Sequence, residues 1–349
     1  MVHVVLLLAC AVAIYVACEW FVNAVEWLGV RLRVGPVAIG TVLAAAGTAL
    51  PESVVTLVAV LSGSPQGAEV GVGAALGGPL VVGTVAYGVT GFMLLRRRRS
   101  AARVPVAAGA GAGEQVAPGA DADELGGVDT GRLARDQVWF LVIFVVQVAL
   151  GLVAFAWKPW LGWFFLAAYV VYFRREVGGG GEAASGEELE PLKLQPRRAA
   201  PHTAAVVVQT VVTLAIVFAA SQLFVAQLTW AGPALGLPAV VVGLLLSPLA
   251  TELPETMNAI IWVRQGKAEL ALANISGAMM IQATVPSALG LFFTPWRFDA
   301  PLVLAGLATI ASVSYLLVVL RSGRLTPARL AVAALFYVAF AVALVVQLA

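Results

Sequence analysis

The sequence is poor in charged residues, cysteine and histidine. Asp, Glu, Lys and Arg make up 11% of the 349 residues, whereas 61% are hydrophobic. A soluble domain usually holds about a quarter charged residues, so this shortage excludes an ordinary soluble domain and indicates a chain that lies mostly in lipid. The net charge of +2 adds little, because the placement of the charges matters more than their sum.

The scarcity of metal-binding residue types also limits the function. The two cysteines, Cys10 and Cys18, lie in one apolar segment and are interpreted as packing residues, not as a disulfide or a metal pair. The two histidines, His3 and His202, cannot form a zinc site with these cysteines at any usual spacing. We therefore expect no permanently bound cofactor.

Long apolar runs fill most of the chain instead. A membrane-spanning helix needs about 20 mostly apolar residues, whereas barrel strands would be alternating segments of about ten residues. The first run, residues 1–29, has no basic start and is too long for a signal peptide, so it is interpreted as a spanning helix. The sequence predicts an all-α membrane protein with ten transmembrane helices, at residues 3–29, 36–62, 69–95, 137–156, 159–175, 203–229, 238–263, 268–292, 300–320 and 329–348.

Two polar stretches interrupt the apolar runs. Residues 96–136 begin with four arginines and continue with Ala and Gly, and residues 176–202 contain four consecutive glycines followed by glutamates. Such compositions cannot bury a core and predict flexible linkers. The expected division is a first repeat region (1–95, helices 1–3), a linker (96–136), helices 4 and 5 (137–175), a second linker (176–202), a second repeat region (203–292, helices 6–8), and helices 9 and 10 (293–349).

The basic residues predict the orientation in the membrane. With ten helices, all of the 21 Lys and Arg residues except Lys158 and Arg297 fall on one side. Basic residues concentrate on the cytoplasmic side of membrane proteins. We therefore expect a multi-pass protein of the cell (plasma) membrane with both linkers in the cytoplasm and both termini outside.

The sequence contains an internal repeat. Residues 35–52 read GPVAIGTVLAAAGTALPE, and residues 238–255 read PAVVVGLLLSPLATELPE. An offset of 203 residues aligns these stretches, and it becomes 200 residues further downstream. Each repeat contributes five predicted helices, an odd number, so the two repeats must insert with opposite orientation. Inverted repeats of this kind are typical of transporters, with the substrate site near the midplane of the membrane where the repeats meet.

The repeated stretch places acids inside apolar segments. Glu52 and Glu255 occupy equivalent positions, and each follows a threonine, Thr48 or Thr251, by four residues and so shares its helix face. A carboxylate at that depth costs several kcal/mol unless it faces a partner or water. The functional interpretation is a cation site, and the structural alternative is that each glutamate bonds a neighbouring hydroxyl and fixes helix packing.

A proline precedes each of these glutamates. Proline has no amide hydrogen, so Pro51 cannot bond the carbonyl of Gly47, and Pro254 cannot bond that of Ala250. Carbonyls freed at membrane depth need another partner, and a cation is one. Each half thus offers a carboxylate, a hydroxyl and a carbonyl. These all-oxygen ligands suit Ca²⁺ and Na⁺ better than Mg²⁺, which holds its waters tightly.

These residues resemble the α-repeats of the sodium/calcium exchanger family, within the cation/calcium antiporter superfamily, as a divergent bacterial-type member. The resemblance rests on two in-register copies of the pattern G-T-x-L-P-E, each followed by a glycine-rich helix. It covers helices 1–3 and 6–8 and the ten-helix layout. It implies that Ca²⁺ is exchanged for Na⁺ or H⁺ by alternating access, at a site made by helices 2 and 7 together with polar residues of helices 3 and 8.

The sequence departs from the family pattern on helices 3 and 8, which is roughly G-N-x-x-G-S-N. Helix 3 reads Gly77-Gly78-Pro79 and has Val82 at the later polar position, so its side-chain ligands are largely missing. Helix 8 keeps Asn274 and has Gln282 at the later position. We take Asn274 and Gln282 as candidate ligands.

A third acid stands in the second copy of the motif. Glu252 aligns with Ala49, where the family has serine, and it lies three residues before Glu255 on nearly the same helix face. Three carboxylates and one Ca²⁺ leave one negative charge. The charge balance therefore favours a proton or Na⁺ that is also bound somewhere in the protein.

Other classes of function fit the sequence less well. No nucleophile–base pair, metal cluster or phosphate loop accompanies the glutamates, so we expect no enzyme. The loss of polar residues on helix 3 leaves open a non-transporting cation-binding or sensor membrane protein of the same fold. The expected partners are inorganic cations and the lipid bilayer, with no nucleic acid, and the oligomeric state stays open.

Overall fold

The structure is a computed structural model that describes residues 2–61, 65–101, 125, 127–178, 189–234, 236 and 242–348. Within these residues the regular structure is entirely helical, with no β-strand. The all-α fold class predicted from the sequence is therefore confirmed.

Seven helices of the described residues are long and apolar enough to cross a membrane. They are α1 (Val2–Leu32), the stretch Gly71–Arg99, α6 (Thr130–Leu152), Thr203–Gln227 of α8, α12 (Ala268–Phe293), α13 (Ala300–Arg321) and Pro327–Gln347 of α14. A chain with this many apolar helices is a multi-pass membrane protein.

The remaining predicted spans are divided into shorter helices. These are α2 (Pro36–Ala38), the π-helix η1 (Ile39–Ala44) and α3 (Ala45–Leu61), then the 3₁₀-helix η4 (Lys158–Leu161) and α7 (Gly162–Gly178), then the π-helix η6 (Val242–Leu246), α10 (Ser247–Thr251) and α11 (Leu253–Arg264). Because none of these pieces alone has the length of a span, ten transmembrane helices stay a prediction.

Both copies of the repeated stretch contain a π-helical turn at an equivalent position. Ile39, where η1 begins, aligns with Val242, where η6 begins, under the offset of 203 residues. A third π-turn, η2 (Val82–Ala86), separates α4 (Pro65–Val81) from α5 (Tyr87–Ala101). Single π-turns inside α-helices are frequent at functional sites.

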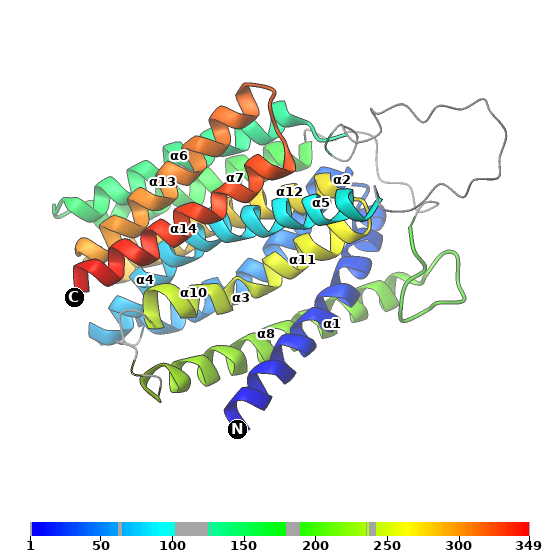
Figure 1. The fold of residues 1–349 in the computed structure, drawn as a ribbon, viewed down its shortest axis with the longest axis horizontal. Helices are drawn as coiled ribbons and strands as arrows, with labels where there is room; N and C mark the ends of the chain where they lie inside the picture. The colour runs from blue at the N-terminus through cyan, green and yellow to red at the C-terminus, as the bar shows by residue number, and fades with distance from the viewer. Residues whose placement is uncertain are drawn as a thin grey trace.

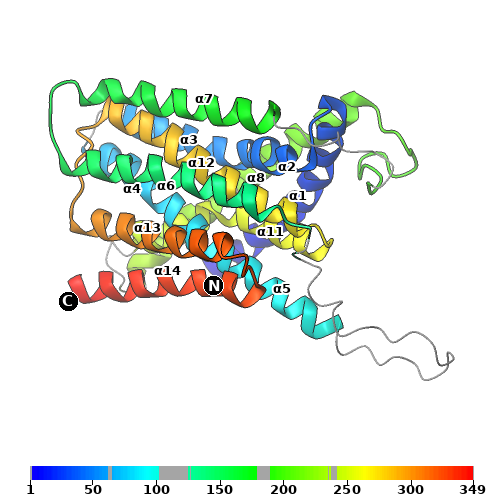
Figure 2. The ribbon, with the colours of Figure 1, turned by 90° about the horizontal axis from the view of Figure 1, so that it is seen from above.

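Helix α12 lies at the centre of the molecule. In its most apolar window 83% of the residues are buried inside the protein, against 28% in α1 and in α8 (Thr203–Ala234). α12 packs against α3, α4, α6, α7 and α11, whereas α1 and α8 lie side by side at the edge of the bundle (Figures 1 and 2). The repeated motif thus sits between a central helix and a peripheral pair.

The helix pairs follow the internal repeat. α1 packs on α8 and α6 packs on α13, so each of these helices contacts its own counterpart in the other half of the chain. α5 packs on α14 (Pro327–Leu348), and the equivalent pair is α12 packed on α7. Likewise α4 packs on α10, and the equivalent pair is α12 packed on η1. Figure 2 shows α7, α6, α13 and α14 as nearly parallel rods. Exchanging the first half of the chain for the second converts this set of pairs into itself.

The linkers are shorter than the sequence predicted. α5 continues through the arginines to Ala101, and α6 already begins at Thr130, because the Asp129 side chain accepts the backbone N–H of Arg132 at 2.8 Å and so caps the helix. α7 likewise continues to Gly178. Asp136 and Glu176, which the predicted boundaries assigned to linkers, therefore lie in helices and are both 4% exposed.

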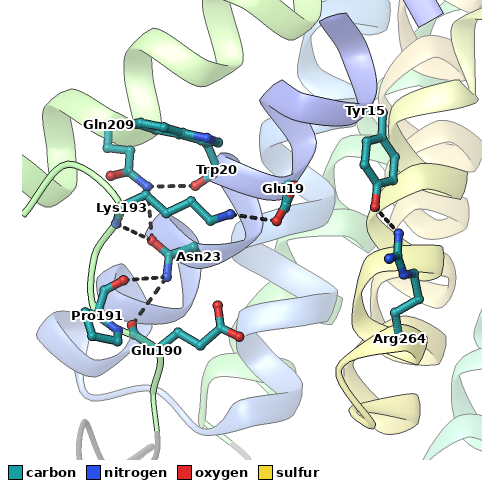
Figure 3. A network of polar contacts seen from close by, with 9 residues as sticks. All are labelled: Tyr15, Glu19, Trp20, Asn23, Glu190, Pro191, Lys193, Gln209 and Arg264. Atoms are coloured by element: carbon teal, nitrogen blue, oxygen red, sulfur yellow. Dashed lines mark hydrogen bonds and ion pairs between the residues drawn. The ribbon is translucent and has the colours of Figure 1, made fainter. Parts of the chain in front are cut away.

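Residues 189–202, the second part of the predicted linker 176–202, pack on α1 and α8, and we call them the strap. Asn23 of α1 donates to the carbonyls of Glu190 and Pro191, both at 3.3 Å, and its Oδ1 accepts the backbone N–H of Lys193 at 3.0 Å (Figure 3). Lys193 also pairs with Glu19 at 2.7 Å. This part of the predicted flexible linker is held in place, by contacts between residues about half the chain apart.

Candidate cation site

The second copy of the motif lies at a break between two helices. α10 ends at Thr251 and α11 begins at Leu253, and Glu252 between them has φ −89° and ψ 7°. Proline at position 254 has no N–H with which to continue the ladder. The chain nevertheless stays compact there, because the N–H of Glu252 bonds the carbonyl of Pro248 at 3.0 Å.

Glu252 and Gln282 meet across the contact between the α10–α11 break and α12. Gln282 Nε2 donates to Glu252 Oε2 at 2.6 Å, and the two residues are 1% and 0% exposed, respectively. Gly78 of α4 faces both, since a Cβ at Gly78 would lie 3.0 Å from Glu252 Oε1 and 3.1 Å from Gln282 Cδ. The missing side chain on α4 therefore leaves the space that these two side chains fill.

Glu255 and Asn274 form the second contact between these helices. Asn274 Nδ2 donates to the backbone carbonyl of Glu255 at 3.4 Å, and the two residues are 0% and 1% exposed, respectively. Both polar residues predicted on helix 8, Asn274 and Gln282, thus contact the acidic motif of α10 and α11.

The two motif threonines bond to the backbone of their own helices. The Thr48 hydroxyl donates to the Ala44 carbonyl and the Thr251 hydroxyl to the Pro248 carbonyl, both at 3.1 Å. A hydroxyl that donates its proton in this way keeps its oxygen lone pairs for a cation. Thr48 is buried, and Thr251 is partly buried next to the buried Ala250.

Helices α1 and α8 cover the motif from one side. A Cβ at Gly47 would lie 2.7 Å from Phe21 of α1 and 3.2 Å from Leu214 of α8. Cys18 of α1 lies with its Sγ 3.8 Å from the Pro254 carbonyl in the other copy of the motif. The peripheral helix pair therefore closes over both copies.

The structure gives the backbone of Glu52 within α3, and the Glu52 side chain lies outside the described part of the chain. The approach of the Glu52 and Glu255 carboxylates therefore stays a prediction. Within the described side chains there is no group of three or more His, Cys, Asp and Glu residues that suits a metal ion. The oxygen atoms brought together here belong to carboxylates, amides, hydroxyls and the backbone.

Two contacts of this region were not predicted from the sequence. Gly78 was interpreted as part of the loss of polar side chains on helix 3, and its close approach to the Glu252 carboxylate was not expected. Glu26 was not singled out, yet its carboxylate, 4% exposed, accepts Trp262 Nε1 at 2.8 Å and pairs with Lys267 at 2.6 Å. The signal available in the sequence was an acid near the end of a long apolar run. In the structure this acid connects α1 with α11 and with the turn between α11 and α12.

Comparison with known proteins gives a family match over most of the chain. The family model described as sodium/calcium exchanger protein matches residues 2–174 and 205–349. No curated protein matches the chain in sequence.

Solved structures of the sodium-calcium exchanger NCX_Mj are similar to this one. A structure soaked with 2.5 mM Na⁺ and 0.1 mM Sr²⁺ has a TM-score of 0.71 at 18% identity and covers 97% of each chain. A second, soaked with 10 mM Na⁺ and no Ca²⁺, has a TM-score of 0.70 at 18% identity and covers 96% of each chain. At this identity the similarity establishes a shared fold.

Proposed function

Because the chain belongs to the sodium/calcium exchanger protein family, we propose that it is a secondary active antiporter that exchanges Ca²⁺ for Na⁺ or H⁺. The proposed site lies where α3, the α10–α11 break and α12 meet. Its ligands are the carboxylates of Glu52, Glu252 and Glu255, the hydroxyls of Thr48 and Thr251, the carbonyls of Gly47 and Ala250, and the amides of Asn274 and Gln282.

The observation that carries this proposal is the burial of Glu252 and Glu255 at one helix break. Their exposures are 0% and 1%, and they lie three residues apart. Burying a carboxylate costs several kcal/mol unless charge and hydrogen bonds compensate. A transported cation supplies that charge. Ca²⁺ accepts six to eight oxygen ligands at about 2.3–2.6 Å in flexible geometry, which suits a mixed set of donors.

The arrangement of helix pairs supports alternating access between inverted repeats. The pairs exchange with one another when the two halves of the chain are exchanged. A site shared by two such halves opens to one side or the other as one half moves against its counterpart. The peripheral pair α1 and α8, which covers both motifs, is much less buried in the protein than the central helix α12.

The counter-ion follows from the charge balance. Three carboxylates around one Ca²⁺ leave one negative charge, and the Glu252 contact with Gln282 adds a neutral amide rather than a positive group. The site therefore either keeps a proton or Na⁺ together with the calcium ion, or releases the calcium ion in exchange for protons or Na⁺.

Transport assays on the purified chain in proteoliposomes test this function. We expect ⁴⁵Ca²⁺ uptake to be driven by an imposed Na⁺ gradient or pH gradient, varied separately, and to be lost in Glu255→Gln. Glu69→Gln, at an exposed position on α4, is the matched control and should keep uptake. Uptake that ignores both gradients would exclude antiport, and Ca²⁺ binding without flux would indicate the cation-binding or sensor alternative.

We also propose the orientation in a plasma membrane, with the linkers in the cytoplasm and the termini outside. It rests on the concentration of basic residues and is supported by Arg97 of α5, which donates to the Val263 carbonyl at 2.7 Å, so that the basic ends of two predicted helices are neighbours. Labelling of single cysteines added near Arg97 and near Lys158 should give opposite sidedness in intact cells.

A further inference from the structure

A second group of buried charged side chains lies where α6 and α7 pack on α12 and η1, and we call it the α6–α7 centre. Its acids are Asp136 of α6 and Glu176 of α7, both 4% exposed. Arg132, one turn before Asp136, pairs with Glu176 at 2.6 Å. None of these side chains belongs to the proposed cation site.

Each acid of this centre bonds a different helix next to the proposed cation site. The Thr41 hydroxyl of η1 donates to Glu176 Oε2 at 3.2 Å, and the Ser276 hydroxyl of α12 donates to Asp136 Oδ2 at 3.2 Å. η1 and α12 touch between them, because Gly277 lies directly against the Thr41 backbone. Ser276 faces α6, whereas Asn274 on the same helix contacts α11. The centre is therefore separate from the cation site but adjoins it through α12.

The charges of the α6–α7 centre do not balance. It holds two buried carboxylates, and its guanidinium, that of Arg132, is bound to Glu176. Arg135, which also acts electrostatically on Asp136, is exposed to solvent. A buried carboxylate without a compensating cation is costly, and such a group neutralises itself by binding a proton.

A small cavity connects Asp136 with the polar start of α6. Its volume of about 20 Å³ has room for about one water molecule. Asp136 lines it together with Arg132, Asp129 and Glu269. A buried carboxylate with one side on a hydrated cavity can exchange a proton with water.

A buried hydroxyl adds unused hydrogen-bonding capacity beside the acids. The Tyr172 hydroxyl has no hydrogen-bond partner within the described part of the chain, and Tyr172 is 1% exposed. It interacts electrostatically with both Asp136 and Glu176. Buried polar atoms usually have a hydrogen-bond partner, so this hydroxyl indicates that a water molecule or a protonated carboxyl group lies beside it.

We propose that Asp136 is a proton-binding site of this protein, which takes up and releases its proton through the cavity at the start of α6. The proton moves between the carboxylate and cavity water, and no other bond forms or breaks. Proton binding stands by itself, whereas its influence on exchange rests on the proposed antiport. The charged and titratable groups that face Asp136 or its cavity are Asp129, Arg132 and Arg135 at the start of α6, Glu176 and Tyr172 on α7, Tyr87 on α5 and Glu269 on α12.

Infrared spectroscopy of the purified full chain tests proton binding without any transport assay. With Ca²⁺ in excess near neutral pH, the protein should show a carboxylic-acid C=O band that disappears in Asp136→Asn. Asp299→Asn, at the start of α13, is the matched control, because this residue is exposed, lies outside the cavity, and asparagine also caps helices, and it should keep the band. A band that is absent from the wild type, or unchanged in Asp136→Asn, overturns the proposal.

Glu176→Gln separates proton binding from a merely structural role while leaving Asp136 in place. Without Glu176, the Arg132 guanidinium is released from its partner, and Asp136 lies four residues further along the same helix, within its reach. The Asp136 band should then be lost near neutral pH and return on acidification. Persistence of the band in this variant near neutral pH would contradict the charge balance described above.

Calcium flux shows whether this proton site acts on exchange. In proteoliposomes, Asp136→Asn should keep ⁴⁵Ca²⁺ exchange but lose at least half of its variation with pH. If the wild type shows no flux, the antiport proposal fails while the infrared result still decides proton binding. If flux occurs and its pH profile is the same in Asp136→Asn, Asp136 has no influence on exchange.

Discussion

The two copies of the repeated motif have the same threonine, proline and glutamate, but the helices around them differ. In the first copy α3 continues through Pro51, whereas in the second α10 ends and α11 begins on either side of Glu252. The second copy also has Pro248, which aligns with Ala45. The first copy, with one proline, therefore stays a continuous helix. The second copy, with two prolines six residues apart, is broken at Glu252, and this additional acid is buried.

The helices that follow the motifs differ in the opposite sense. α4 has Gly78 and is followed by a π-turn, whereas α12 is continuous and supplies Asn274 and Gln282. Glu252 fills space beside Gly78. α4 thus lacks a polar side chain where the facing segment of the other repeat carries an additional acid. The difference in one repeat therefore compensates for the difference in the other.

The largest effect is expected from removing the acid that both copies share. Glu255→Gln should lower Ca²⁺ affinity by roughly 100-fold, since loss of one buried charge partner costs about 3 kcal/mol. Isothermal titration with Ca²⁺ measures this directly. Equal affinities in Glu255→Gln and the control Glu69→Gln would remove Glu255 from the site.

A second substitution makes α12 resemble α4. Gln282 aligns with Val82, so Gln282→Val gives the second copy the residue of the first. The buried Glu252 carboxylate then loses an amide donor, which costs about 2 kcal/mol or roughly 30-fold in Ca²⁺ affinity. An unchanged affinity would mean that Glu252 and Gln282 do not act together in binding.

A smaller effect is expected from filling the gap on α4. Gly78→Ala places a methyl group 3.0 Å from Glu252 Oε1 and should weaken Ca²⁺ binding by about fivefold, because a tightly packed site resists even one added carbon. Gly73→Ala on the same helix is the control, as a Cβ there meets no atom within 4 Å. The same loss in both variants would point to a general effect on α4 instead of the Glu252 contact.

The smallest effect on transport is expected at the edge of the bundle. Asn23 aligns with Ala226 of α8 under the same offset, so Asn23→Ala makes α1 resemble its counterpart. Loss of the strap contacts should lower the unfolding free energy by about 1–2 kcal/mol, seen as a lower melting temperature, with Ca²⁺ affinity unchanged. A large loss of affinity would instead place Asn23 in the binding machinery.

Much of the helical architecture was predictable from the sequence because apolar runs and prolines are local signals. The predicted runs 268–292 and 300–320 lie within one residue of α12 and α13 at each end. The predicted linker 96–136 was too long because charged helix ends have the composition of a linker. Arg96–Arg99 lie in the last two turns of α5, and Arg132 lies in the first turn of α6 beside the buried Glu176.

The contacts of the candidate site and of the strap were less predictable. The bond between Glu252 and Gln282 joins residues 30 positions apart, and that between Asn23 and Pro191 joins residues 168 positions apart. Local pattern contains no information on which of several buried polar residues meet. The repeat identified the acids and the threonines, and the packing of α4 and α12 decided the partner of the extra acid.

The strap has a consequence for how the two halves of the chain hold together. By sequence it leads into α8, but its backbone is bonded to the side chain of Asn23 in α1. The second half of the chain is therefore bonded to the first by contacts that do not depend on a continuous backbone between them. Two polypeptides ending at residue 178 and beginning at residue 189 should accordingly assemble when they are expressed together.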